Sequence, residues 1–442
     1  MKTRLLLAVS ALLLFVSVNA QQVTYEEYDL DNGLHVILHQ DNSAPVVTTS
    51  VMYHVGAKNE DPNKTGFAHF FEHLLFEGSK NIERGEWRGI VASRGGQFNA
   101  NTSQDRTYYY VTFPSNNLEL GLWLESERLM HPIINDIGVK TQSEVVQEER
   151  RLRYDNAPYS RWREQMFKNL FTIHPYRWQT IGSLEHLASA SLDDFKEFNQ
   201  KYYIPNNAVL VVAGDIDVPK TKTLIQQYFG PIPKGDDIEM PVFQEEPIQE
   251  SSKVKYFDPN IQIPLIMLGY RTPAQTEKEA YVLDLISSYL SSGKSSKLYK
   301  KLVDDQKQAL QVIAFNSSQE DYGAYILGAL PLGETSLQEL IGEIDEEIVK
   351  IQTDLITEKD YQKLQNKIEN QFVNSNSSIQ GIANSLARYY MLYDETSLIN
   401  NEIDIYRSIS REEIRDVANK YLNTNQRVVL EYLPKEEEKS KP

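Results

Sequence analysis

Three side chains that could serve a metal ion lie within five residues of an otherwise apolar segment: His69, Glu72 and His73. On a helix, His69 and His73 are one turn apart and share a face, with Glu72 beside them. Two neutral imidazoles at this spacing can hold one divalent ion, and zinc suits histidine and carboxylate ligands. Glu72 could then act as general base on the water that the ion carries. The competing interpretation is two ordinary helix histidines beside a surface glutamate.

A third ligand has to come from another part of the chain. All eight histidines precede residue 187 and there is no cysteine, which leaves carboxylates as the best candidates. In "VKTQSEVVQEERRLRYD", Gln142 and Glu149 are two helical turns apart and share a face. Glu148 points about 100° away on the same helix, and the same geometry turns Glu144 to solvent. Glu149 is therefore the better candidate and Glu148 the weaker one.

The order H-x-x-E-H is the inverzincin signature. With this motif and the segments around it, the chain resembles the pitrilysin family of zinc metallopeptidases. The similarity is to its two-domain bacterial and mitochondrial-processing-peptidase-like members. The segments that carry it are "TGFAHFFEHLLFEGS", "GGQFNANTSQDRTYYYVTFP", "SEVVQEERR", "HPYRWQTIGSLEHL" and "SSGKSSKLYKKL". The resemblance implies one Zn²⁺ per chain held by His69, His73 and Glu149, with Glu72 as the base. It also implies a two-domain chain that forms half of a clamshell around a chamber.

A substrate strand is expected next to this site. Gly95-Gly96 permits a sharp turn, and an extended segment follows from Gln97 to Ala100. On sequence alone this is an ordinary strand. The family resemblance implies an edge strand that binds substrate as an added strand, with Phe98, Asn99 and Ala100 in contact with it. The expected activity is zinc-dependent endopeptidase cleavage of peptides or unfolded segments.

Two positions depart from the family pattern. Gln142 stands where many relatives carry a second glutamate, and we expect it only to orient its neighbours. Val303 and Leu310 stand where the second domain of relatives supplies an arginine and a tyrosine. We therefore expect either a homodimer or a heterodimer, and in the heterodimer a same-fold subunit that donates these groups. The alternatives are a structural scaffold of the same family and a module that captures peptides without cutting them.

The chain repeats itself, which indicates two duplicated domains. Setting Ser191 on Ser410 aligns a capping box, an amphipathic helix, an Asn-containing loop and an apolar strand without a gap. Between the copies, residues 231–252 are rich in proline and acidic residues and should form an extended linker. We place the zinc-binding domain at 23–230, a homologous domain without metal at 253–436, and a charged tail at 437–442.

The order of the expected elements gives the fold class. Strands are expected at 33–40, 46–55 and 106–114, and long helices at 117–131 and 139–154. Strands adjacent in sequence, with helices set apart, favour an α+β fold in which each domain packs helices on a mostly antiparallel sheet.

The N-terminus predicts export. Lys2 and Arg4 precede an apolar segment from 5 to 16, and small residues end at Ala20, as in a cleavable signal peptide over 1–20. A retained membrane anchor is the weaker alternative, because the apolar segment is short. The mature chain should be periplasmic or secreted, without membrane insertion. A formal net charge of −17 argues against non-specific nucleic-acid binding.

Overall fold

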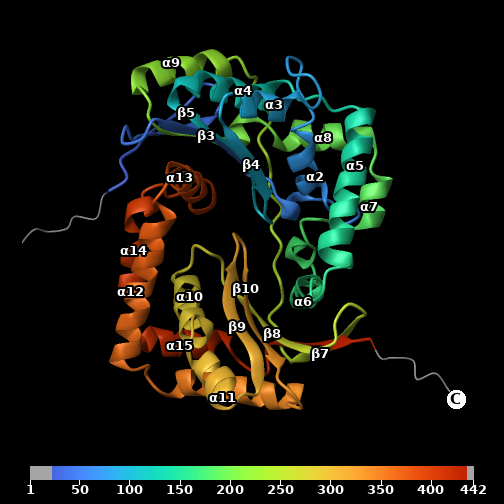
Figure 1. Ribbon diagram of the computed structural model, residues 1–442, viewed down its shortest axis with the longest axis vertical. Helices are drawn as coiled ribbons and strands as arrows, with labels where there is room; N and C mark the ends of the chain where they lie inside the picture. The colour runs from blue at the N-terminus through green and yellow to red at the C-terminus, as the bar shows by residue number, and fades with distance from the viewer. Residues whose placement is uncertain (1–21, 436–442) are drawn as a thin grey trace, which may run out of the picture.

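The computed structural model describes residues 22–435 and contains two mixed β-sheets, each packed with helices, at opposite ends of the molecule (Figure 1). The expected signal peptide (1–20) and charged tail (437–442) lie outside the described residues. Within residues 22–435, no helix is long and apolar enough to cross a membrane. The first sheet contains β1 (Glu26–Asp29), β2 (His35–Gln40), β3 (Val46–Tyr53), β4 (Gln97–Thr102), β5 (Thr107–Pro114) and β6 (Ala208–Gly214). The second contains β7 (Ser252–Asp258), β8 (Leu265–Thr272), β9 (Ala309–Ser318), β10 (Gly323–Pro331) and β11 (Val428–Pro434).

The two sheets have the same topology. Their strand orders are β1-β2-β6-β3-β5-β4 and β7-β11-β8-β10-β9, so the second sheet repeats the first without β1. Each contains one parallel pair, β2 with β6 and β7 with β11, and its other pairs are antiparallel. The strands β6 and β11 follow α8 (Leu192–Tyr202) and α15 (Arg411–Tyr421), which both begin with a capping box. The α+β prediction is confirmed.

Both faces of the first sheet are buried. Every residue of β6 is buried, and alternate residues point to opposite faces: Leu210 and Val212 to one, Val209 and Val211 to the other. The first face is covered by α2 (Phe67–Leu74), α3 (Glu86–Ser93), α4 (Leu118–Met130), α8 and α9 (Val218–Phe229). The continuous apolar sequence of β6 therefore reflects burial on both sides.

The second face is covered by α13 (Ile379–Tyr393), a helix that follows the second sheet's strands β7–β10 in sequence. Its buried residues Ile382, Ala383, Leu386 and Ala387 pack against the β2, β3 and β6 side chains (Figure 1). Conversely, α6 (Trp162–Leu170) follows strands of the first sheet but packs through Met166, Phe167 and Leu170 on the second.

These two helices are equivalent in the repeat. With Ser191 set on Ser410, α6 falls on residues 381–389, inside α13. The two halves thus exchange corresponding helices reciprocally. The outer face of the second sheet is covered by α10 (Lys278–Ser291), α11 (Leu337–Thr353), α12 (Glu358–Ser375), α14 (Leu398–Arg407) and α15.

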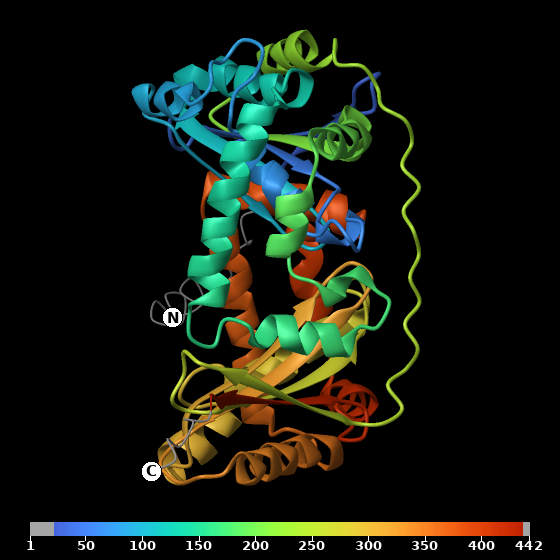
Figure 2. The same cartoon turned by 90° about the vertical axis from the view of Figure 1, so that its right-hand side faces the viewer.

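The segment between the halves is extended and runs along one side of the molecule (Figure 2). It is fixed at Glu245, whose carboxylate accepts the backbone N–H groups of Thr172, Ile173 and His174 at 2.7–2.8 Å. Arg271 pairs with the same carboxylate at 3.1 Å.

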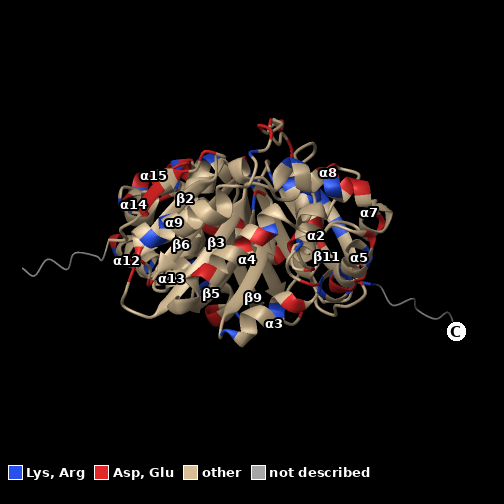
Figure 3. Ribbon diagram, turned by 90° about the horizontal axis from the view of Figure 1, so that it is seen from above, with Lys and Arg blue, Asp and Glu red and all other residues tan. Residues whose placement is uncertain are grey.

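Seen from above, acidic and basic residues are mixed over the helices of the first half (Figure 3).

The packing of α13 makes a stability prediction. Leu386 is fully buried against the first sheet. Leu386→Ala should lower the free energy of unfolding by about 2–5 kcal/mol, because it removes buried methyl groups and leaves a cavity. Urea denaturation followed by circular dichroism measures this. Gln380→Ala, at an exposed position of the same helix, is the control and should change it by less than about 0.5 kcal/mol. Equal effects of the two substitutions would contradict the assignment.

Candidate metal centre

The helix α2 presents its polar side chains on one face because its apolar ones are all buried on the other. Phe67, Phe70, Phe71 and Leu74 lie in the core of the first half, and the three phenylalanine rings pack on Phe195 and Phe198 of α8. His69, Glu72 and His73 are left on the partly exposed side. The 3.6-residue period of this apolar set therefore fixes the direction of the three polar groups.

The start of α2 is held by a residue that the motif did not reveal. The carboxylate of Glu60, 5% exposed, accepts the N–H groups of Gly66 and Ala68, both at 2.9 Å. Burial raises the pKa of Glu60 to about 8, against the opposing effect of these N–H donors. Gly66 has φ +100 and would place a Cβ within 3.0 Å of the Ile181–Gly182 backbone. A glutamate seven residues before the first residue of a helix has no local spacing signal, so sequence reasoning missed it.

Glu149 reaches the two histidines from α5 (Asp136–Arg150). Its Oε2 lies 3.3 Å from His73 Nε2 and 3.7 Å from His69 Nε2, and one ligand atom from each residue falls within 4.8 Å of the others. Ligands about 2.0–2.1 Å from a tetrahedral zinc lie roughly 3.3 Å apart. The donor set and its spacing therefore fit zinc. Glu148, by contrast, is exposed and pairs with Arg151.

The electrostatics of the group also suit a metal. Burial, and then the neighbouring His73, lowers the pKa of His69, which keeps that imidazole neutral near pH 7. The hydrogen bond with His73 lowers the pKa of Glu149 and keeps it ionised. Arg153 binds the other oxygen of Glu149 at 2.7 Å. Within residues 22–435, no protein group accepts from the buried Nδ1 of His69.

Glu72 is oriented by a side chain that the sequence did not single out. Thr102, the last residue of β4, donates its hydroxyl to Glu72 Oε2 at 2.6 Å. Burial raises the pKa of Glu72, and this hydrogen bond acts in the opposite direction. A carboxylate held in this position can act as a general base. Thirty residues separate the pair, so only the approach of α2 to β4 reveals it.

The predicted substrate strand is an edge strand. Phe98, Asn99 and Ala100 lie on β4, which ends the first sheet and pairs with β5; no other strand within residues 22–435 pairs with it. Phe98 packs on Phe76, just after α2, with ring centroids 5.1 Å apart. Ala100 is buried and Asn99 exposed. The edge of β4 on which no described strand pairs thus lies beside the helix that carries Glu72.

The two departures from the family pattern have clear surroundings. The side-chain amide of Gln142 donates to Glu77, which also pairs with Arg84. Gln142 therefore contacts a residue just after α2 and not one of the predicted zinc ligands. Val303 lies in a helical segment at Tyr299–Asp305, packed against the core of the second half. Leu310 is 46% exposed on β9.

Known proteins with similar sequences identify the family. Residues 35–183 match the family model "Insulinase (Peptidase family M16)", and residues 189–368 match "Peptidase M16 inactive domain". The zinc protease PqqE of Helicobacter pylori is 30% identical over 95% of this chain and 96% of that protein. The chain belongs to peptidase family M16.

Solved M16 structures share the fold. The crystal structure of a protease from Helicobacter pylori matches with a TM-score of 0.88 and 29% identity, over 93% of this chain and all of that one. The periplasmic protease PqqL from Escherichia coli matches with a TM-score of 0.77 and 18% identity, over 94% of this chain and 48% of that one. The M16 resemblance and the two-domain fold inferred from the sequence are confirmed, and zinc is the metal implied for the family.

The ligand geometry predicts that His69, His73 and Glu149 bind zinc. Glu149→Gln and His73→Ala should each weaken zinc binding by more than about 100-fold. Loss of a residue that only hydrogen-bonds to a metal ligand already lowers the metal affinity by about 10–100-fold. Competition with a chromogenic chelator measures the affinity. Glu148→Gln, one residue away on α5 and exposed, is the matched control and should bind zinc like the wild type. Zinc affinity of Glu149→Gln equal to that control would exclude Glu149 as a ligand.

Proposed function

We propose that this M16 chain is a zinc-dependent endopeptidase that cleaves peptides or unfolded segments bound as an added strand along β4. The observation that carries the proposal is the convergence of His69, His73 and Glu149 beside Glu72. Loss of any one of these groups would remove either the metal or the base, and this chain keeps them all.

The chemistry follows from the positions of the groups. When bound, Zn²⁺ would polarise the scissile carbonyl and make water at the site more acidic. Glu72 takes a proton from the attacking water as the C–O bond forms at the carbonyl carbon. It then passes the proton to the amine, and the C–N bond breaks as the carbonyl re-forms. Thr102 holds Glu72 in one orientation during both transfers. The free edge of β4 binds the substrate through main-chain hydrogen bonds, which give affinity with little side-chain selectivity.

We also propose that the active form pairs this chain with a second unit of the same fold, as a homodimer or heterodimer. Only a heterodimer could supply the arginine and tyrosine, because a second copy of this chain carries the same Val303 and Leu310. Val303 and Leu310 cannot donate the hydrogen bonds expected at their positions, and a missing donor of this kind costs about 10²–10³ in rate. The PqqL chain is about twice as long, which supports a working unit of two such halves. Mixing this chain with a same-fold subunit that carries the arginine and tyrosine should then raise turnover above either alone.

Export to the periplasm or the exterior remains part of the proposal and rests on residues 1–20. A non-catalytic scaffold is the second candidate, favoured by Val303 and Leu310 and by the description of the model matched by residues 189–368. Retention of the three metal-competent residues and Glu72 favours the peptidase.

Peptide hydrolysis tests the proposal directly. The zinc-loaded mature chain should cleave internally quenched peptides of about 8–20 residues, and Glu72→Gln should reduce the rate by at least about 10²-fold, since proton transfer by a positioned base contributes that much. Fluorescence release gives the rate. If the chain binds zinc but cleaves no peptide, alone or with a same-fold partner, the peptidase proposal is wrong and the non-catalytic scaffold is the remaining candidate.

The hydroxyl of Thr102 provides a finer test. Thr102→Val should lower kcat by at least about tenfold, because a hydrogen bond to a charged group contributes about 1.5–3 kcal/mol. Thr102→Ser keeps the hydroxyl and should stay within about threefold of the wild type. Both variants are compared at equal zinc occupancy. Indistinguishable kcat values for the two would mean that Thr102 does not orient Glu72.

A further inference from the structure

The orientation of Glu72 depends on a hairpin, β4 and β5 with the turn at residues 103–106, here called the site hairpin. Thr102, which binds Glu72, is the last residue before the turn. Ser103 closes the turn: its N–H donates to Arg106 O at 2.9 Å, and its hydroxyl accepts the N–H groups of Asp105 and Arg106 at 3.2 Å. Whatever fixes this turn also fixes Thr102 and the free edge of β4.

The first support comes from the first half. The N–H groups of Ala57 and Lys58 donate to Ser103 O and Gln104 O at 3.1 and 2.8 Å. A Cβ at Gly56 would lie 2.4 Å from Gln104 O, so only glycine permits this approach. The turn is therefore held from one side by backbone hydrogen bonds.

The second support is Asp105, which points away from solvent into the boundary between the halves. It is 3% exposed. One carboxylate oxygen accepts the Tyr176 hydroxyl at 2.5 Å, and the other accepts the backbone N–H of Glu320 at 3.2 Å. Lys58 Nζ lies 3.4 Å away. Glu320 belongs to the turn between β9 and β10, in the second sheet, so the site hairpin is anchored across the two halves.

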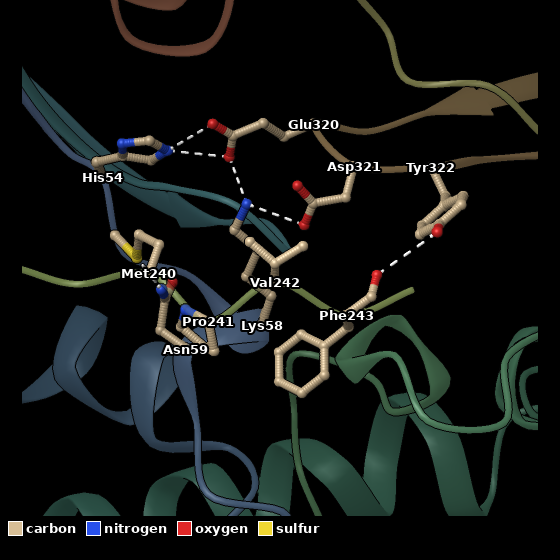
Figure 4. A pocket seen from close by; sticks show the side chains of 10 residues that line it. All are labelled: His54, Lys58, Asn59, Met240, Pro241, Val242, Phe243, Glu320, Asp321 and Tyr322. Carbon is tan, nitrogen blue, oxygen red and sulfur yellow. Dashed lines mark hydrogen bonds and ion pairs between the residues drawn. The ribbon is translucent and has the colours of Figure 1, made fainter. Parts of the chain in front are cut away.

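The β9–β10 turn, residues 319–322, is held firmly by the first half. The Glu320 carboxylate binds His54 Nε2 at 2.9 Å and Lys58 Nζ at 2.5 Å (Figure 4). Asp321 Oδ2 lies 3.1 Å from His174 Nε2 and 3.3 Å from Lys58 Nζ. These contacts surround Lys58 with carboxylates that come from both halves.

Tyr176 connects this turn to Asp105 directly. Its hydroxyl donates to Asp105 and accepts the N–H of Asp321 at 3.1 Å. The ring is fully buried beside Phe171 and His174. One hydroxyl thus joins the site hairpin to the second half.

A cavity of about 440 Å³ lies next to these residues, between them and the linker segment 240–243 (Figure 4). Its charged lining groups, Lys58, Glu320 and Asp321, already pair with one another or with His54 and His174. The cavity is therefore better explained as the boundary of an internal support than as a ligand site.

We propose that residues 319–322 of the second half are a positioning element for the site hairpin. Through Asp105 and Tyr176 they hold the turn that places Thr102, and hence Glu72 and the substrate edge. This gives the second half a role in turnover that is independent of Val303 and Leu310. The inference rests on the proposed peptidase function for its kinetic consequence, but its structural consequence can be measured without turnover.

The test removes a single hydroxyl. Tyr176→Phe keeps the buried ring and breaks both hydrogen bonds of the connection. Tyr432→Phe is the matched control: Tyr432 is also fully buried and donates to a buried aspartate, Asp258, in the second sheet. Both variants are prepared as full-length mature chains with zinc, whose content is measured. Hydrogen–deuterium exchange is followed by mass spectrometry over residues 97–112, and kcat and KM are determined per zinc-loaded chain.

Tyr176→Phe should speed amide exchange in residues 97–112 and lower kcat/KM about tenfold at unchanged zinc content, whereas Tyr432→Phe should leave both at wild-type values. A second variant, Glu320→Gln with Asp321→Asn, should act in the same direction. Exchange over 97–112 that is the same in Tyr176→Phe and Tyr432→Phe would overturn the proposal.

Failure of the proposed function has a different signature. If the wild type cleaves no peptide, alone or with a partner, the peptidase assignment fails, while the exchange data still decide whether the second half holds the hairpin. If exchange changes but kcat and KM per zinc-loaded chain do not, the contacts are structural only and the positioning role is wrong.

Discussion

The structure depends on one constraint: each sheet has two apolar faces, and neither half covers both of its own. Buried β6 shows this most clearly, because Val209 and Val211 face away from the helices of the first half and need α13. The second sheet needs α6 in the same way. Burial of apolar area is the dominant favourable term in folding, so the exchange of these two helices fixes how the halves meet. The contact between Asp105 of the first half and Glu320 of the second forms at the boundary that this exchange of helices creates.

The candidate metal centre is built on that frame by ordinary packing. The aromatic side of α2 is buried against α8, which turns His69, Glu72 and His73 toward α5 and β4. Polar groups then refine the placement. Glu60 holds the start of the helix, and Thr102 holds the base. The metal-competent residues all come from the first half, yet the hairpin beside them is also supported by the second. A domain that carries no ligand can in this way still shape the site.

The sequence predicted what depends on local geometry. Histidines four residues apart must share a helical face, and Glu149 rather than Glu148 follows from the period of α5. The duplication was visible because aligned capping boxes and strands keep their register. Contacts between distant segments carry no such period. Nothing in the sequence pairs Thr102 with Glu72 or places Glu60 at the start of α2. Nor does it indicate that α6 and α13 each cover the sheet of the other half. These depend on tertiary packing alone.

The reciprocal exchange also bears on how such a chain could arise. A polypeptide with only one of the repeats would expose one face of its sheet and would carry a helix with no sheet of its own to cover. Two identical copies would satisfy both needs by swapping that helix, as a symmetric dimer with one isologous interface. Joining two such copies through a segment like 231–252 turns the swap into an intramolecular contact. Once joined, the copies no longer have to remain identical, so one can keep the metal-competent residues while the other loses them.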